Sequence, residues 1–262
     1  MTAETAFMTV ITDPLFYALA VPAVVVLGLS KGGFSGVGQM ALPIMALALP
    51  PLEAAAIMLP IMIVQDLAAL WVYRKDWNGR IIATMLPGAL LGVALAGVLA
   101  AYVSDAAVRV FIAVFTLAFV LYNWIGPSRV AKEAGSASLA GGVFWGAGSG
   151  FTSTICQAGA PPYLMYALSQ HMTKMTFVGT TAFFFAAVNW LKVVPYVALG
   201  QFSATGLRTS LVLLPLAVVT NLLGFWLVRI TPQQLFFRIT HALLFLISLE
   251  LLRSGIAGLL RG

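Results

Sequence analysis

Hydrophobic residues fill this chain in long runs, and short polar or Gly/Pro-rich joints separate one run from the next. A helix needs about 20 apolar residues to cross the hydrocarbon core of a bilayer, and most of the runs approach that length. The pattern therefore predicts an all-α polytopic membrane protein with eight to ten hydrophobic segments. The runs cover residues 14–30, 39–50, 52–73, 80–103, 106–126, 137–149, 157–169, 175–199, 207–229 and 232–253.

Two of these runs, 39–50 and 157–169, are short for a full crossing and are expected to be half-helices or re-entrant pieces. Each lies at the end of a Gly-rich stretch, residues 28–39 in the first half and residues 146–157 in the second. Irregular backbone at membrane depth is tolerated only where protein buries it or where it lines a cavity. Paired interruptions in two halves of a chain therefore predict two broken helices that form the substrate site of a transporter.

The two halves match in more than these stretches. Arg80 and Arg208 each precede a Leu-Pro pair by the same spacing. We therefore expect two structural repeats, residues 1–127 and 137–262, joined by the polar linker 128–136. An odd number of segments in each repeat would invert one repeat relative to the other in the membrane.

Composition supports the membrane assignment, since 61% of the 262 residues are hydrophobic and only 8% are charged. Soluble domains carry about 25% charged residues. The net charge of +6 comes from basic residues scattered over joints and helix ends. Anionic lipid head groups and the positive-inside rule account for that excess, so the expected partner is the lipid bilayer and not a nucleic acid.

Basic residues also predict an orientation. The joint that carries Arg74, Lys75 and Arg80 lies two crossings from the linker 128–136, which carries two more basic residues. Both joints therefore lie on one side, expected to be the cytoplasm. Arg208 falls on the other side and counts against this orientation.

The interruptions also predict the sign of the substrate. Half-helices that start after each break would aim unpaired N–H groups at one anion, and hydroxyl and amide side chains would add further donors. The alternative is that the glycines only let helices pack closely. The residues expected to bind the substrate are Lys31, Gly32, Gly33, Ser35, Gln39, Gly150, Thr152, Ser153, Cys156 and Gln157.

Several of the polar residues in apolar runs have two interpretations. Lys31 either attracts an anion or extends to the membrane interface. Cys156 either contacts the ligand or is a small hydrophobic residue. Asp66 is a candidate for proton coupling, with pairing to Arg74 as the alternative. For Lys192, extension to the interface at a segment end is favoured over a place along the substrate path.

The sequence lacks the residues that several other functions require. Two His and one Cys without ligand spacing predict no metal or haem site and no cofactor. The sequence contains no Walker-A lysine motif and no Ser/His/Asp arrangement, so neither ATP-driven transport by this chain nor an enzyme is expected.

The stretch from Lys31 to Gly38, running into Leu42-Pro43 and repeated weakly from Gly146 to Pro161, resembles the TauE/SafE family of sulfite and organosulfonate transporters. The resemblance spans nearly the whole chain. It implies secondary transport of small sulfur oxyanions or sulfonates across the bacterial inner membrane. A compact oxyanion also suits the convergent N–H, hydroxyl and amide donors.

These observations together predict a multi-pass secondary transporter in the inner membrane that exports sulfite by alternating access. The alternatives are a scaffold subunit of a membrane complex, and a permease for another small anion or for a metal cation. Paired acidic residues would be expected for a cation, and Asp66 and Glu250 provide little support for it. Whether the chain forms a homo-oligomer stays open.

Overall fold

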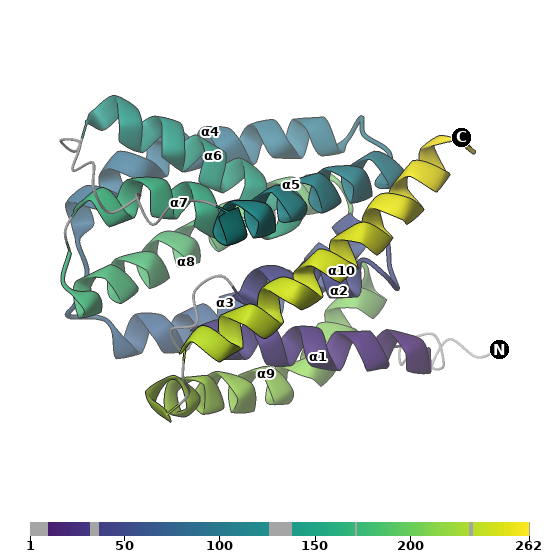
Figure 1. The fold of residues 1–262 in the computed structure, drawn as a ribbon, viewed down its shortest axis with the longest axis horizontal. Helices are drawn as coiled ribbons and strands as arrows, with labels where there is room; N and C mark the ends of the chain where they lie inside the picture. The colour runs from purple at the N-terminus through teal and green to yellow at the C-terminus, as the bar shows by residue number, and fades with distance from the viewer. Residues whose placement is uncertain (1–9, 32–36, 126–137, 171, 231–232, 262) are drawn as a thin grey trace.

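The computed structural model describes residues 10–31, 37–125, 138–170, 172–230 and 233–261. Every regular element in these ranges is a helix, which confirms the predicted all-α class. Figure 1 shows most of the long helices running along the long axis of the molecule, with α10 crossing them at an angle. The elements are α1 (Pro14–Lys31), η2 (Val37–Met40), α2 (Ala41–Met45), α3 (Pro51–Val72), α4 (Gly79–Ala100), α5 (Asp105–Ile125), α6 (Leu139–Cys156), α7 (Ala160–Ala167), η4 (Leu168–Gln170), α8 (Lys174–Ala198), α9 (Ala204–Ile230) and α10 (Gln233–Leu259).

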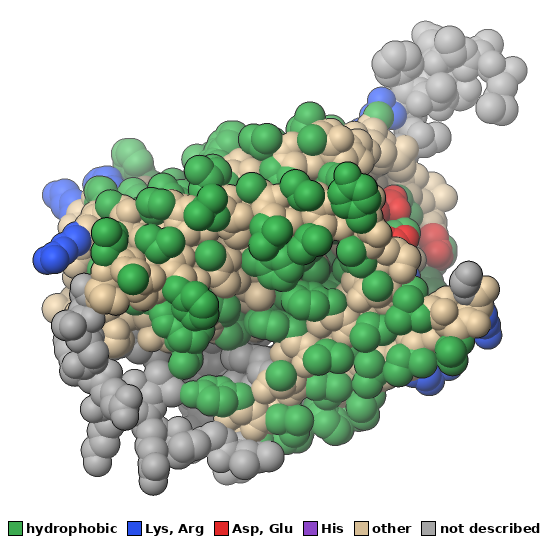
Figure 2. Space-filling model, turned by 90° about the horizontal axis from the view of Figure 1, so that it is seen from above, with side chains coloured by type: hydrophobic (Ala, Val, Ile, Leu, Met, Phe, Trp, Pro, Cys, Tyr) green, Lys and Arg blue, Asp and Glu red, His purple; other side chains and the backbone are tan. Residues whose placement is uncertain are grey.

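Six helices within the described ranges contain a segment long and apolar enough to cross a membrane: α1, α3, α4, α5, α8 and α9. Their outward side chains are large and hydrophobic, as at Leu91 on α4 and Val194 on α8, which are 63% and 71% exposed. Figure 2 shows such side chains over the middle of one face, with charged residues toward its ends. This distribution is that of a multi-pass membrane protein.

Helices α6 and α7 form a hairpin that returns to the end from which it starts. The chain reverses at Gln157, which ends α6 in a left-handed conformation (φ 53°). Leu139 at the start of α6 and Gln170 just after α7 line the same small polar pocket as Asn78. The start of α6 and the end of α7 therefore lie at the end of the molecule that holds the α3–α4 joint.

Helix α1 and the short η2–α2 segment form a second pair, which begins and ends at the opposite end of the molecule. The backbone N–H of Ile11, before α1, donates to Thr209 near the start of α9. Leu49, after α2, accepts a hydrogen bond from Arg109 near the start of α5. Because α4 begins at the α3–α4 joint, the start of α5 lies at the other end of the molecule. The two helix pairs thus approach the centre from opposite ends.

The long helices pair in a pattern that exchanges the two halves of the chain. Helix α1 packs on α9 and α6 packs on α4, while α3 contacts both α8 and α9, and α8 contacts both α3 and α4. Glycines permit the closest contacts. A Cβ at Gly92 would lie 2.0 Å from the Ala147 carbonyl oxygen, and one at Gly28 would lie 2.2 Å from Oγ1 of Thr220.

The predicted break inside the second Gly-rich stretch is wrong. Residues from Gly146 to Ser153 lie within the continuous helix α6, and the chain leaves the helix only at Gln157. Gly146 and Gly150 instead face the backbone of α4, where a Cβ would lie 2.1 Å and 2.3 Å from carbonyl oxygens. Close helix packing explains these glycines, and the proline pair that opens α7 sets where the new helix begins.

In the first half, α1 ends at Lys31 and the 3-10 helix η2 begins at Val37. The predicted break lies between them, in residues 32–36, which are outside the described residues. The same holds for the predicted linker 128–136. Residues of α1, α2 and α3 contribute to one hydrophobic core, in which Leu42 and Met45 are fully buried.

Candidate functional site

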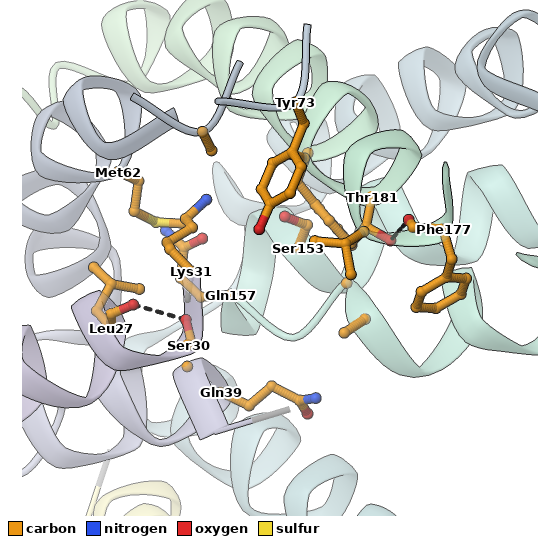
Figure 3. A pocket seen from close by; sticks show the side chains of 17 residues that line it. Leu27, Ser30, Lys31, Gln39, Met62, Tyr73, Ser153, Gln157, Phe177 and Thr181 are labelled. Atoms are coloured by element: carbon orange, nitrogen blue, oxygen red, sulfur yellow. Dashed lines mark hydrogen bonds between the residues drawn. The ribbon is translucent and has the colours of Figure 1, made fainter. Parts of the chain in front are cut away.

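A cavity of about 280 Å³ lies where α1, η2, α3 and α8 meet the turn between α6 and α7. Its wall is mostly apolar, with Phe177 and Phe185 of α8 among the largest side chains. Figure 3 shows the side chains around it. The polar residues that line it are Ser30, Lys31, Gln39, Tyr73, Ser153, Gln157 and Thr181.

Two glutamines, one from each Gly-rich stretch, line this cavity. Gln39 lies in η2 and is 6% exposed, and Gln157 lies at the α6–α7 turn and is 8% exposed. The amide nitrogens Nε2 of both side chains are buried and find no hydrogen-bond partner among the described residues. A buried N–H group without an acceptor is costly, so both positions favour a ligand that accepts hydrogen bonds.

The orientation of Gln157 is fixed by Lys192. The Lys192 ammonium, which is fully buried, donates to Oε1 of Gln157 over 2.5 Å and to Oγ of Ser153 over 3.2 Å. An ammonium has only donors, so the oxygen of the Gln157 amide must face it. The favoured expectation that Lys192 extends to the membrane interface is therefore wrong, because α8 carries it into the centre of the molecule.

A second polar cluster lies beside the first on α8. Asp66 of α3 forms an ion pair with Lys31, and its other carboxylate oxygen accepts a 2.6 Å hydrogen bond from Asn189. The side chain of Asp66 is 2% exposed. The alternative pairing with Arg74 is wrong, since Arg74 donates to the Trp71 carbonyl and lies over its ring. Lys31 is held at the cavity and does not extend to the interface.

Four of the predicted site residues line the cavity: Lys31, Gln39, Ser153 and Gln157. The others in α6 do not. Thr152 donates to the Gly148 carbonyl and the Cys156 thiol donates to the Thr152 carbonyl, so both groups are satisfied within their own helix. Gly150 packs against α4. Gly32, Gly33 and Ser35 lie outside the described residues.

The start of α7, the helix that follows the break, lies at the cavity, since Gly159 and Ala160 line it, whereas α6 presents its other end. Ser153 and Gln157 lie at its C-terminal end, where unpaired carbonyl groups carry partial negative charge. Side chains therefore supply the donors here: the Gln157 amide directly, and the Lys192 ammonium behind it. The arrangement suits an anion through the amide and ammonium groups and the start of α7, and not through the end of α6.

Asn189 and Lys192 were not among the predicted site residues. Both are polar residues in an apolar run and stand three positions apart, which places them on one face of a helix. That spacing was a usable signal. Tyr73 and Thr181 offered none, because a single hydroxyl near a helix end is common in membrane helices.

Apolar helices around a cavity with buried amide and ammonium groups define the class of this protein, a polytopic membrane transporter. A family model described as "Sulfite exporter TauE/SafE" matches residues 20–251, which cover α2 to α9 in full and most of α1 and α10. The chain belongs to the TauE/SafE family. Comparisons with curated proteins and with solved structures found no match.

Proposed function

We propose that this protein exports small sulfur oxyanions or organosulfonates, with sulfite the foremost substrate, by secondary transport. One observation carries the proposal: Gln39 and Gln157 approach the same cavity from opposite ends of the molecule, and each brings an amide N–H that has no partner among the described residues. Family membership supports the same class of substrate. An oxyanion with several acceptor oxygens can accept from both amides at once.

Charge in the site also favours an anion. Lys31 is paired with Asp66, whereas the Lys192 ammonium makes its hydrogen bonds, within the described residues, to neutral oxygens. Among the described residues of the site, two lysines, Lys31 and Lys192, therefore lie near one carboxylate, that of Asp66. A metal-cation permease is disfavoured, because both oxygens of Asp66 are already occupied by Lys31 and Asn189.

The proposed mechanism is alternating access by two inverted repeats, residues 1–127 and 137–262. The exchange of partners between the halves supports it, since α1 packs on α9 as α6 packs on α4. The mechanism is also supported by the way in which the two helix pairs, α1 with η2–α2 and α6 with α7, approach the centre from opposite ends of the molecule. Rocking of one repeat against the other would expose Gln39 and Gln157 first to one side of the membrane and then to the other.

The described conformation is proposed to face the cytoplasm. Tyr73 at the end of α3 and Phe177 near the start of α8 line the cavity, so it lies toward the α3–α4 joint. That joint carries Arg74, Lys75 and Arg80, and basic joints mark the cytoplasmic side of the bacterial inner membrane. Toward the other end, Ile57 and Tyr196 are fully buried in the core.

Asp66 is proposed to couple transport to protons. Its carboxylate holds the Lys31 ammonium at the cavity wall, so protonation of Asp66 would free that ammonium for an anion. The membrane potential also favours export, since an anion leaving the cell gains about 2.3 kcal/mol per charge for each 100 mV.

The proposal is tested on purified protein in liposomes. Labelled sulfite uptake is measured in competition with sulfate, thiosulfate, sulfoacetate and acetate. We expect sulfite and sulfonates to compete and acetate to compete weakly. Transport of sulfite by this chain alone would exclude a mere scaffold subunit, whereas uptake of a divalent cation without uptake of sulfite would point to a cation permease.

A further inference from the structure

Lys192 contributes to the proposed anion site although it is not among the residues that line the cavity. We propose that Lys192 is a positioning residue: it turns the amide N–H groups of Gln157 toward the cavity and makes them stronger donors. This inference rests on the proposed function and assigns a role to a buried cation that the transport scheme above does not use.

The orientation follows from what each group can donate. The Lys192 ammonium offers three N–H donors and no acceptor, so it can bind only the oxygen of the Gln157 amide. The distance between Nζ and Oε1 is 2.5 Å. The nitrogen lies on the other branch of the same planar amide, is buried, and has no partner among the described residues. With Lys192 in place, a rotation of the Gln157 amide that turned Oε1 toward the anion would turn its NH2 group toward the ammonium. Two donors would then face each other.

The ammonium is itself held in place. It also donates to the hydroxyl and the carbonyl oxygen of Ser153, over 3.2 Å and 3.4 Å, at the C-terminal end of α6. A cation is stabilised at such an end by the exposed carbonyl groups. One turn earlier on α8, Asn189 binds Asp66 of α3. Lys192 therefore extends from a helix that is held to α3 one turn before it.

The charge of Lys192 also reaches the anion through the amide. A cation bound to a carbonyl oxygen draws electron density from the amide nitrogen, and hydrogen bonds in a chain strengthen one another in surroundings of low dielectric constant. The N–H groups of Gln157 thereby become better donors than those of an amide whose oxygen binds no cation. The effect needs no direct contact between Lys192 and the substrate.

The test is a double-mutant cycle in purified protein. The variants are Lys192→Met, Gln157→Leu and the combination, and the measurement is the Kd for sulfite from competition binding. Because a hydrogen bond that involves a charged group contributes about 1.5–3 kcal/mol, each single change is expected to weaken binding by roughly 10-fold to 100-fold. The Kd of the double variant is expected to equal the larger of the two single-variant Kd values, since both changes remove the same donor.

The control is Lys75→Met, the same substitution at an exposed lysine of the α3–α4 joint, which should leave the Kd unchanged. Additive losses in the cycle, or wild-type affinity in Lys192→Met, would overturn the inference while the proposed function stands. Absence of sulfite binding by the wild-type protein would overturn both.

Gln157→Glu keeps the test decisive if Lys192→Met does not fold. A carboxylate at this position still binds Lys192, so the hairpin stays supported, but it presents an oxygen to the cavity in place of the N–H groups. We expect folded protein that binds sulfite at least tenfold more weakly. Wild-type affinity in this variant would contradict the assigned orientation of Gln157.

Discussion

The amide nitrogen of Asn189 donates a 2.6 Å hydrogen bond to Oδ2 of Asp66 and so joins α8 to α3 across the two halves of the chain. Oδ1 of the same carboxylate binds the Lys31 ammonium at the end of α1. Three helices therefore meet at one buried carboxylate. Both of its oxygens are occupied, which explains how an acidic side chain is tolerated among apolar helices.

Replacement of Asp66 by Asn is expected to destabilise the protein. The Lys31 ammonium, whose side chain is 15% exposed, would lose its charged partner, and breaking a buried ion pair from one side costs about 3–5 kcal/mol. The measurement is the free energy of unfolding, or the melting temperature, in detergent.

A double variant supplies the rescue for this prediction. Lys31→Met combined with Asp66→Asn should regain most of the lost stability, because no uncompensated charge remains. The control is Glu250→Gln, which removes one partner of the exposed pair with Arg253 and should have no measurable effect. A double variant as unstable as Asp66→Asn would contradict the explanation.

Gln39→Leu is expected to weaken sulfite binding about tenfold while the protein remains folded. The change keeps the volume of the side chain nearly constant and removes one amide donor from a desolvated site. Binding is measured by competition, and folding by thermal unfolding.

Gln65→Leu is the matched control for this change. Gln65 is a buried glutamine of α3 that does not line the cavity, and its amide donates to the carbonyl of Ala217. Its replacement should lower stability without changing the affinity for sulfite. Equal losses of affinity at Gln39 and Gln65 would mean that Gln39 acts only through the fold.

Gly92→Ala is expected to disrupt the packing of α4 on α6. The new Cβ would lie 2.0 Å from the Ala147 carbonyl oxygen, so one backbone must move, and overpacking of this kind costs about 1–3 kcal/mol or more. Gly148→Ala is the control on α6, because its Cβ would face α7 and meet only Pro162 there, at 3.4 Å. Melting temperatures of the two variants test this. A fall for both, or for neither, would count against the prediction.

A cysteine at Val178 tests the direction in which the cavity opens. Val178 lines the cavity and remains partly exposed, whereas the natural Cys156 is buried and should contribute little background. With an impermeant thiol reagent, we expect Val178→Cys to be modified from the cytoplasmic side and protected by sulfite. Modification from the outside alone would reverse the proposed orientation.

Much of the fold could be predicted from local pattern. The run expected at 52–73 is α3 at Pro51–Val72, and the run expected at 175–199 is α8 at Lys174–Ala198. Such runs are recognisable because a bilayer requires a long apolar stretch whatever its neighbours are. The glycines of α6 were interpreted wrongly because sequence alone does not distinguish a glycine that breaks a helix from one that admits a neighbouring helix.

The sequence by itself determined the class of protein, the order of its apolar segments and two glutamines, Gln39 and Gln157, that line the cavity. These depend on hydropathy and on residues close together along the chain. Only the tertiary structure decided that Lys192 binds Gln157 and that Lys31 binds Asp66, since each pair is separated by 35 residues and belongs to different elements. Whether a buried cation meets a carboxylate, an amide or water depends on which faces of packed helices meet, and packing alone sets that.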